Sequence, residues 1–101
     1  MAALPIELPR EEIEAFCLRH RIRKLSLFGS VLTPRFSPRS DVDVLVEFEL
    51  GQKPTLFGLA GMELELTELL GRKVDLREPE EISKYFRDEV LTSAVVQYER
   101  G

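Results

Sequence analysis

Three aspartates occupy positions at which their carboxylates could act together. Asp41 and Asp43 open the hydrophobic run DVDVLVEFE, and Asp75 lies in a later short run, KVDLRE. Side chains two residues apart on a strand share a face and lie about 6.5 Å apart. If the two runs pair as strands, the three carboxylates converge on one point, where a cation would relieve their repulsion. The pattern therefore predicts a metal site made of carboxylates.

The use of aspartate at these positions supports that prediction. The chain contains 14 glutamates and only 4 aspartates, and three of those four are Asp41, Asp43 and Asp75, although aspartate is disfavoured in strands. Carboxylate oxygens favour Mg²⁺ or Mn²⁺, and two such ions about 3.5–4 Å apart would suit a phosphoryl-type transfer. We therefore expect a site for divalent ions, either Mg²⁺ or Mn²⁺. The alternative is that each aspartate marks only a strand end or a turn.

A Gly-Ser pair precedes the first two aspartates. Gly29 and Ser30 follow the short alternating run KLSLF, and ten residues separate Ser30 from Asp41. A glycine at the end of a strand lets the backbone approach a phosphate closely, and the next N–H groups and the serine hydroxyl can bind it. A Gly-Ser pair alone is most often a plain turn. Its spacing from the aspartates favours a phosphate-binding role.

The elements that must position these residues follow from the hydrophobic periodicity. We expect a helix from Pro9, a strand over KLSLFGS, an irregular loop with two prolines, and a strand over DVDVLVEFE with its valines on one face. A second helix spans 56–70 and ends at Gly71. The third strand is KVDLRE, and a last helix runs from Glu80 to about Ser93 with Ile82, Phe86 and Val90 facing inward.

The pattern for the closing AVVQYE is compatible with a last helical turn or a short edge strand. The order helix, strand, strand, helix, strand, helix predicts an α/β (α+β) fold, with a small mixed sheet and helices packed on one face. The other face of such a sheet is available for chemistry.

Composition excludes several classes of protein. The chain has 101 residues, 44% of them hydrophobic, with a net charge of −4 and a pI near 5.1. An acidic chain is a poor candidate for direct nucleic-acid binding, and no apolar run is long enough to cross a membrane. The first residues lack the features of a signal peptide, and the single Cys17 forms no internal disulfide. We expect a cytoplasmic protein.

In this chain Gly-Ser is followed after ten residues by Asp-Val-Asp, and the later strand KVDL carries a third aspartate. This arrangement resembles the nucleotidyltransferase superfamily that includes DNA polymerase beta. The chain is most similar to its minimal nucleotidyltransferase (MNT) group. The likeness runs from about Ile13 to the C-terminus, and it implies that residues 1–101 form a single minimal nucleotidyltransferase domain.

The resemblance also implies roles for these residues. Gly29 and Ser30 would hold the phosphates of the substrate, which is ATP or another NTP. Asp41 and Asp43 would bind two Mg²⁺ ions, and Asp75 would bind one of them and help to deprotonate an acceptor hydroxyl. The implied reaction transfers a nucleoside monophosphate to that hydroxyl, and pyrophosphate leaves. The three aspartates are thus both metal ligands and catalytic residues.

One departure concerns the loop after Ser30. The family usually has a basic residue soon after Gly-Ser, as in GS-x-A-R-G, whereas this chain reads GSVLTPR. Arg35 or Arg39 is expected to make the missing phosphate contact, in a loop whose shape depends on Pro34 and Pro38.

The resemblance further implies a protein partner. MNT proteins are typically encoded beside a helical HEPN-domain protein, in many cases a toxin, and act as antitoxins by adding AMP to a tyrosine. Two alternatives remain open: an antitoxin that inhibits such a partner by binding alone, and a nucleotide sensor without turnover. Leu56, Phe57 and Tyr98 could form an interface or belong to the domain's own core, and homo-oligomer formation is left open.

Overall fold

The computed structural model describes residues 4–100. The predicted domain over 1–101 also includes residues 1–3 and 101, which lie outside the described residues. The elements, in chain order, are α1 (Arg10–Arg19), β1 (Ile22–Phe28), the 3₁₀ turn η1 (Gly29–Leu32), β2 (Val42–Phe48), α2 (Leu56–Leu70), β3 (Val74–Arg77), the 3₁₀ turn η2 (Pro79–Glu81), α3 (Lys84–Ser93) and β4 (Val95–Glu99).

The four strands form one mixed sheet in the order β3-β2-β1-β4. β1 pairs antiparallel with both β2 and β4, whereas β2 and β3 are parallel. A parallel pair needs a crossover connection, and α2 supplies it between β2 and β3. The predicted α/β fold with a small mixed sheet is confirmed.

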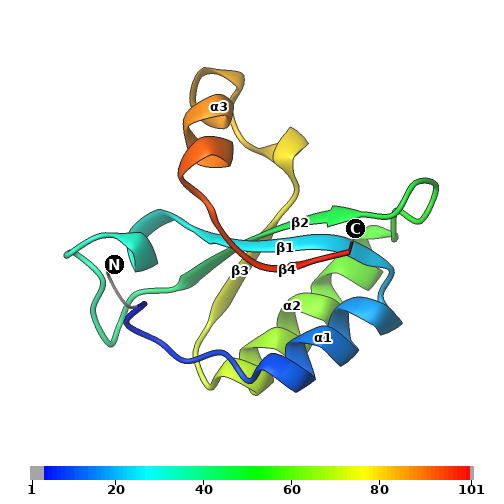
Figure 1. Ribbon diagram of the computed structural model, residues 1–101, viewed down its shortest axis with the longest axis horizontal. Helices are drawn as coiled ribbons and strands as arrows, with labels where there is room; N and C mark the ends of the chain where they lie inside the picture. The colour runs from blue at the N-terminus through cyan, green and yellow to red at the C-terminus, as the bar shows by residue number, and fades with distance from the viewer. Residues whose placement is uncertain (1–3, 101) are drawn as a thin grey trace.

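Helices α1 and α2 cover one face of the sheet (Figure 1). The predicted apolar stripes account for this packing, because the side chains of Phe16 on α1, Leu66 on α2 and Val42, Val44 and Val46 on β2 are all buried in one core. Thr55 caps the first turn of α2 through a hydrogen bond from the Gly58 N–H. As predicted, the helix ends at Gly71, whose φ of 68° is left-handed.

The last helix differs from the sequence prediction. It begins at Lys84 and not at Glu80, because Pro79–Glu81 form the separate turn η2. No residue of α3 is buried, and the Phe86 side chain, predicted to face inward, is 60% exposed. The periodicity identified an apolar helical face, but α3 lies on the side of the sheet opposite α1 and α2, away from the core (Figure 1).

The closing segment forms the edge strand β4 along β1. Tyr98 on this strand packs against the core, so it belongs to the domain itself, whereas Leu56 and Phe57 on α2 are almost fully exposed. In the part of the chain that the structure describes, no helix is long and apolar enough to span a membrane.

The buried face of α2 gives a direct test of this packing. Leu66 is fully buried, whereas Leu64 on the same helix is 68% exposed. We expect Leu66→Ala to lower the free energy of unfolding by about 2–5 kcal/mol and Leu64→Ala to change it by less than about 0.5 kcal/mol. Urea denaturation measures both. Equal losses in the two variants would contradict the assigned core.

Candidate active site

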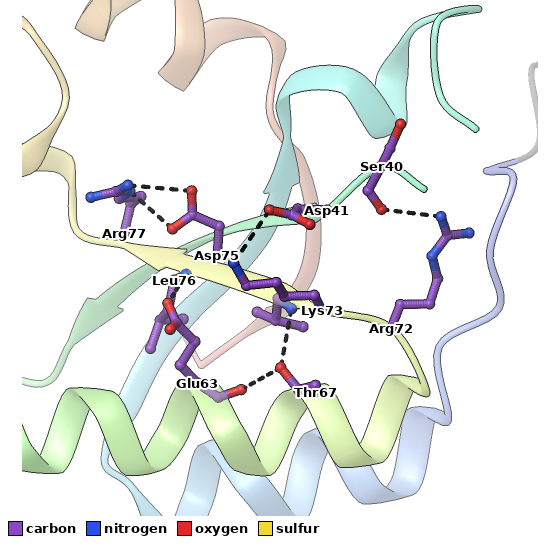
Figure 2. A network of polar contacts seen from close by, with 10 residues as sticks. Ser40, Asp41, Glu63, Thr67, Arg72, Lys73, Asp75, Leu76 and Arg77 are labelled. Atoms are coloured by element: carbon purple, nitrogen blue, oxygen red, sulfur yellow. Dashed lines mark hydrogen bonds and ion pairs between the residues drawn. The ribbon is translucent and has the colours of Figure 1, made fainter. Parts of the chain in front are cut away.

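The pairing of β2 with β3 places two of the predicted aspartates side by side. Asp43 and Asp75 are direct partners in the parallel register, flanked by the pairs Val42–Val74 and Val44–Leu76. Because these valines and Leu76 are buried beneath the sheet, the alternate side chains point to the opposite face. Asp41 immediately precedes β2 and points to this face as well (Figure 2). The predicted grouping of the three aspartates on one face is therefore present.

Helix α2 fixes the strand that carries Asp75. The Val74 N–H donates a hydrogen bond to Thr67 Oγ1 at 3.1 Å, and the Leu76 N–H donates to Glu63 Oε2 at 2.8 Å (Figure 2). These two amides lie on the outer edge of β3, where no further strand of residues 4–100 pairs with it. Two side chains of α2 thus accept hydrogen bonds from the otherwise unpaired amides of β3 on both sides of Asp75.

The turn at Gly29 brings the backbone directly against the Asp43 carboxylate. Gly29 has a φ of 77°, and a Cβ atom placed there would lie 2.2 Å from Asp43 Oδ2. Phe28 is the antiparallel partner of Asp43, so η1 begins where β1 passes Asp43. The two halves of the predicted motif, separated by ten residues, therefore meet in space. Glycine is required at position 29 for both its conformation and its lack of a side chain.

The surroundings of the Asp43 carboxyl shift its pKa in both directions. Partial burial raises the pKa of the Asp43 carboxyl above its ordinary value, and the charge of Asp75 raises that pKa further. The Ser30 backbone N–H lowers the same pKa by hydrogen bonding, Asp41 raises it again, and Arg77 lowers it. The charges of both other aspartates therefore raise the pKa of Asp43.

Two basic residues on β3 and just before it partly neutralise this acidic face. Arg77 contacts Asp75 in a bidentate manner, with Nε 3.2 Å from Oδ1 and a terminal nitrogen 3.3 Å from Oδ2. Lys73 Nζ lies 3.8 Å from Asp41 Oδ2 (Figure 2). Among residues 4–100, no three His, Cys, Asp or Glu side chains stand close enough to form a metal-ligand cluster. The three aspartates therefore share a face but do not converge on one point as predicted. In this conformation the side chain of Asp75 is bound to Arg77.

The loop between η1 and β2 is held by a residue outside the predicted motif. Arg72 donates a hydrogen bond to the Ser40 carbonyl at 3.1 Å and another to the Ser37 carbonyl, and its guanidinium lies 4.3 Å from the centre of the Phe36 ring. Arg35 and Arg39 are exposed on this loop, and within the described range neither guanidinium forms a hydrogen bond or ion pair with another side chain. Their predicted contact with phosphate thus stays a prediction.

Sequence reasoning missed the contribution of Arg77. Asp75 and Arg77 are two residues apart in the strand KVDLRE, and the strand period of two is the signal for a contact between them. Glu63 gave no comparable signal, because its role depends on how α2 crosses the edge of the sheet.

A Gly-Ser turn that faces paired aspartates across a mixed sheet defines a class of site suited to nucleotides and divalent cations. The comparison with known families agrees. A model described as "Nucleotidyltransferase domain" matches residues 10–96, which include every predicted site residue. The chain therefore belongs to the nucleotidyltransferase domain family.

Curated relatives support the same assignment. The chain is 34% identical over 86 residues to a Methanocaldococcus jannaschii protein named "Putative protein adenylyltransferase MJ0435", covering 85% of this chain and 90% of that protein. It is 36% identical over 77 residues to "Protein adenylyltransferase MntA" of Thermococcus cleftensis, covering 68% of this chain and 76% of the relative.

Solved structures share the fold. A "putative minimal nucleotidyltransferase" superposes with a TM-score of 0.70 at 36% identity, over 85% of this chain and 86% of that one. A toxin–antitoxin structure with AMP-PNP gives a TM-score of 0.72 at 19% identity, over 91% and 74% of the two chains. A complex of a tri-AMPylated HEPN toxin of Shewanella oneidensis with an MNT antitoxin gives 0.64 at 17% identity, over 89% and 69%.

The contact between Gly29 and Asp43 can be tested by a pair of glycine variants. Gly29 and Gly51 share a φ of 77°, but a Cβ at Gly51 would meet nothing within 4 Å. Gly51→Ala should lose only the backbone cost, about 1–2 kcal/mol. Gly29→Ala should lose more, because its Cβ also overlaps the Asp43 carboxylate. Thermal and urea unfolding of both variants measure the difference. Equal losses of unfolding free energy would show that the Asp43 carboxylate does not contact the turn at Gly29.

The raised pKa of Asp43 predicts a pH dependence of stability. Because the folded pKa exceeds the unfolded value, the folded state binds more protons between the two pKa values, and stability falls as the pH rises through that interval. Asp43→Asn removes this loss. We expect the free energy of unfolding of the variant, relative to that of wild type, to be higher at pH 7 than at pH 3. Urea denaturation at both pH values measures this difference. A difference that does not change with pH would contradict the assigned environment.

Proposed function

We propose that this nucleotidyltransferase transfers AMP from ATP to a hydroxyl group in a Mg²⁺-dependent reaction. The observation that carries the proposal is the contact of the Gly29 turn with the Asp43 carboxylate, which is itself paired with Asp75. A phosphate bound by the backbone of this turn would lie next to the carboxylates. Both requirements of nucleotidyl transfer, a phosphate site and an acidic site, are thus met within one small surface.

The chemistry of the donor set fits magnesium. Asp41, Asp43 and Asp75 offer hard carboxylate oxygens on one face, and a few carboxylates with substrate phosphates make the usual protein site for this ion. Burial and the charges of Asp75 and Asp41 raise the pKa of Asp43, and a cation bound there would offset both effects. We infer that Asp41 and Asp43 hold two ions and that Asp75 holds one of them. Bound magnesium would neutralise the charge that develops on the phosphates and on the leaving pyrophosphate.

The chain's own groups would then perform defined steps. The Ser30 hydroxyl and the backbone of the Gly29–Ser30 turn bind the phosphates, and Arg35 or Arg39 adds a positive charge from the loop. Asp75 orients the acceptor hydroxyl and takes its proton. The acceptor oxygen forms a bond to the α-phosphorus, the bond from that phosphorus to the bridging oxygen breaks, and pyrophosphate leaves.

The comparisons support a protein acceptor. Two relatives are named as protein adenylyltransferases, and one structure of the same fold pairs an MNT antitoxin with an AMPylated HEPN toxin. We propose that this chain is the antitoxin of a HEPN-type partner in the cytoplasm and that the acceptor is a tyrosine of that partner.

A second candidate is an antitoxin that inhibits a HEPN-type partner by binding alone. Two observations favour it. The loop after Ser30 departs from the family pattern and leaves Arg35 and Arg39 exposed, and Asp75 is bound to Arg77. A double variant, Asp41→Ala with Asp43→Ala, that still neutralises the partner in cells would support this candidate.

The experiment for the enzymatic proposal is label transfer from α-³²P-ATP with Mg²⁺ to the co-purified partner. We expect a labelled partner band with the α-label and none with γ-³²P-ATP, because the α-phosphate is transferred and the γ-phosphate leaves. Asp43→Asn should reduce transfer at least about a hundredfold, since it removes a carboxylate that no neighbour can replace.

Asp88→Asn is the matched control. Asp88 is the fourth aspartate of the chain and lies exposed on α3, outside the site. It should transfer at the wild-type rate. Wild-type transfer by folded Asp43→Asn would disprove the proposed mechanism, and no transfer by folded wild type with its partner present would favour inhibition by binding.

A further inference from the structure

A cleft of about 520 Å³ opens beside the Gly29 turn, between η1 and α3. On one side it is lined by Phe28, Gly29, Leu32 and Thr33, and on the other by Phe86, Glu89, Val90 and Ser93. The volume lies within the range of sites for small organic ligands. Gly29 belongs to both the cleft and the proposed phosphate turn, so the two are continuous.

The apolar lining of the cleft has no structural explanation within the domain. The residues that α3 contributes are spaced three, four and seven apart, which puts them on one helical face. An amphipathic helix normally buries such a face against the core, yet α3 has no buried residue and Phe86 is 60% exposed. The apolar face of α3 instead borders an open cleft next to the site.

The position of α3 is nevertheless well defined. Arg87 donates hydrogen bonds to the carbonyls of Pro79 at 2.9 Å and Ile82 at 3.0 Å, and one of 3.3 Å to Glu80. Arg87 therefore joins the helix to the linker that follows β3. The far end of α3 continues directly into β4, which pairs with β1. Both walls of the cleft are thus fixed to the same sheet.

We propose that this cleft binds the base of the nucleotide, an inference that rests on the proposed function. A nucleotide whose phosphates lie on the Gly29 turn extends through its sugar into an adjoining space, and the cleft adjoins that turn. The lining suits a flat aromatic ring, because Phe28 and Phe86 contribute a phenyl group from opposite walls. Glu89 is the only charged residue among those that line the cleft. Its carboxylate can accept a hydrogen bond from an exocyclic amino group, such as that of adenine.

The test compares a complete nucleotide with its phosphates alone. Calorimetry with Mg²⁺ and the full chain measures the dissociation constants of α,β-methylene-ATP, which cannot transfer AMP, and of tripolyphosphate. We expect Phe86→Ala to weaken binding of the ATP analogue about tenfold or more, because stacking on an aromatic side chain is lost. Binding of tripolyphosphate should not change. Tyr85→Ala is the matched control, since Tyr85 is 82% exposed on the same helix and does not line the cleft.

A second variant tests the role of Glu89. Wild type should bind ATP more tightly than purine riboside triphosphate, which lacks the amino group, and Glu89→Ala should bind both equally. Circular dichroism and the melting temperature establish that each variant is folded.

Three other outcomes would contradict either the base site or the proposed function on which it rests. If Phe86→Ala binds the ATP analogue as wild type does, the base lies elsewhere, and a raised KM for the partner protein in that variant would assign the cleft to the acceptor. Equal affinity of wild type for the ATP analogue and tripolyphosphate would likewise overturn the base site while leaving the phosphate site intact. If wild type binds neither ligand, the proposed function itself fails.

Discussion

The parallel pairing of β2 with β3 is the constraint on which the site depends. The pairing sets Asp43 beside Asp75, and a shift of one residue would turn one of the two aspartates into the core. Burial of Val42, Val44, Val74 and Leu76 on the opposite face opposes such a shift. The outer amides of β3 donate hydrogen bonds to side chains of α2, and these bonds hold the same register from the other side. The hydrophobic core and the acidic face are therefore specified by a single alignment of strands.

That alignment has an electrostatic cost. Partial burial raises the pKa of the Asp43 carboxyl, the charges of Asp75 and Asp41 raise it further, and the Ser30 amide and Arg77 offset this only in part. Arg77 forms an ion pair with Asp75, one of the carboxylates of the proposed metal site. Entry of a divalent ion would therefore exchange an internal ion pair for metal coordination. A site that is unfavourable by itself and relieved by its ligand is a common property of functional surfaces.

Local periodicity was sufficient for much of this account. The period of two placed Asp41 and Asp43 on one strand face, and the period of 3.6 identified α2 together with its end at Gly71. The sequence could not show what the apolar face of α3 would meet, because periodicity reveals a face but not its surroundings; Phe86 was therefore wrongly assigned to the core. The short closing segment was ambiguous for a related reason. The free edge of β1, a tertiary feature, decided that it forms a strand.

The central claim is that Gly29, Ser30 and the three aspartates form one site for a metal-bound nucleotide. A crystal structure of the chain with Mn²⁺ and α,β-methylene-ATP, recorded at a wavelength where manganese scatters anomalously, tests this claim most directly. The account predicts anomalous peaks bound by Asp41 and Asp43, with Asp75 turned from Arg77 toward one of them and the phosphates on the Gly29–Ser30 turn. Manganese held by the phosphates alone, or a triphosphate bound away from this turn, would contradict it.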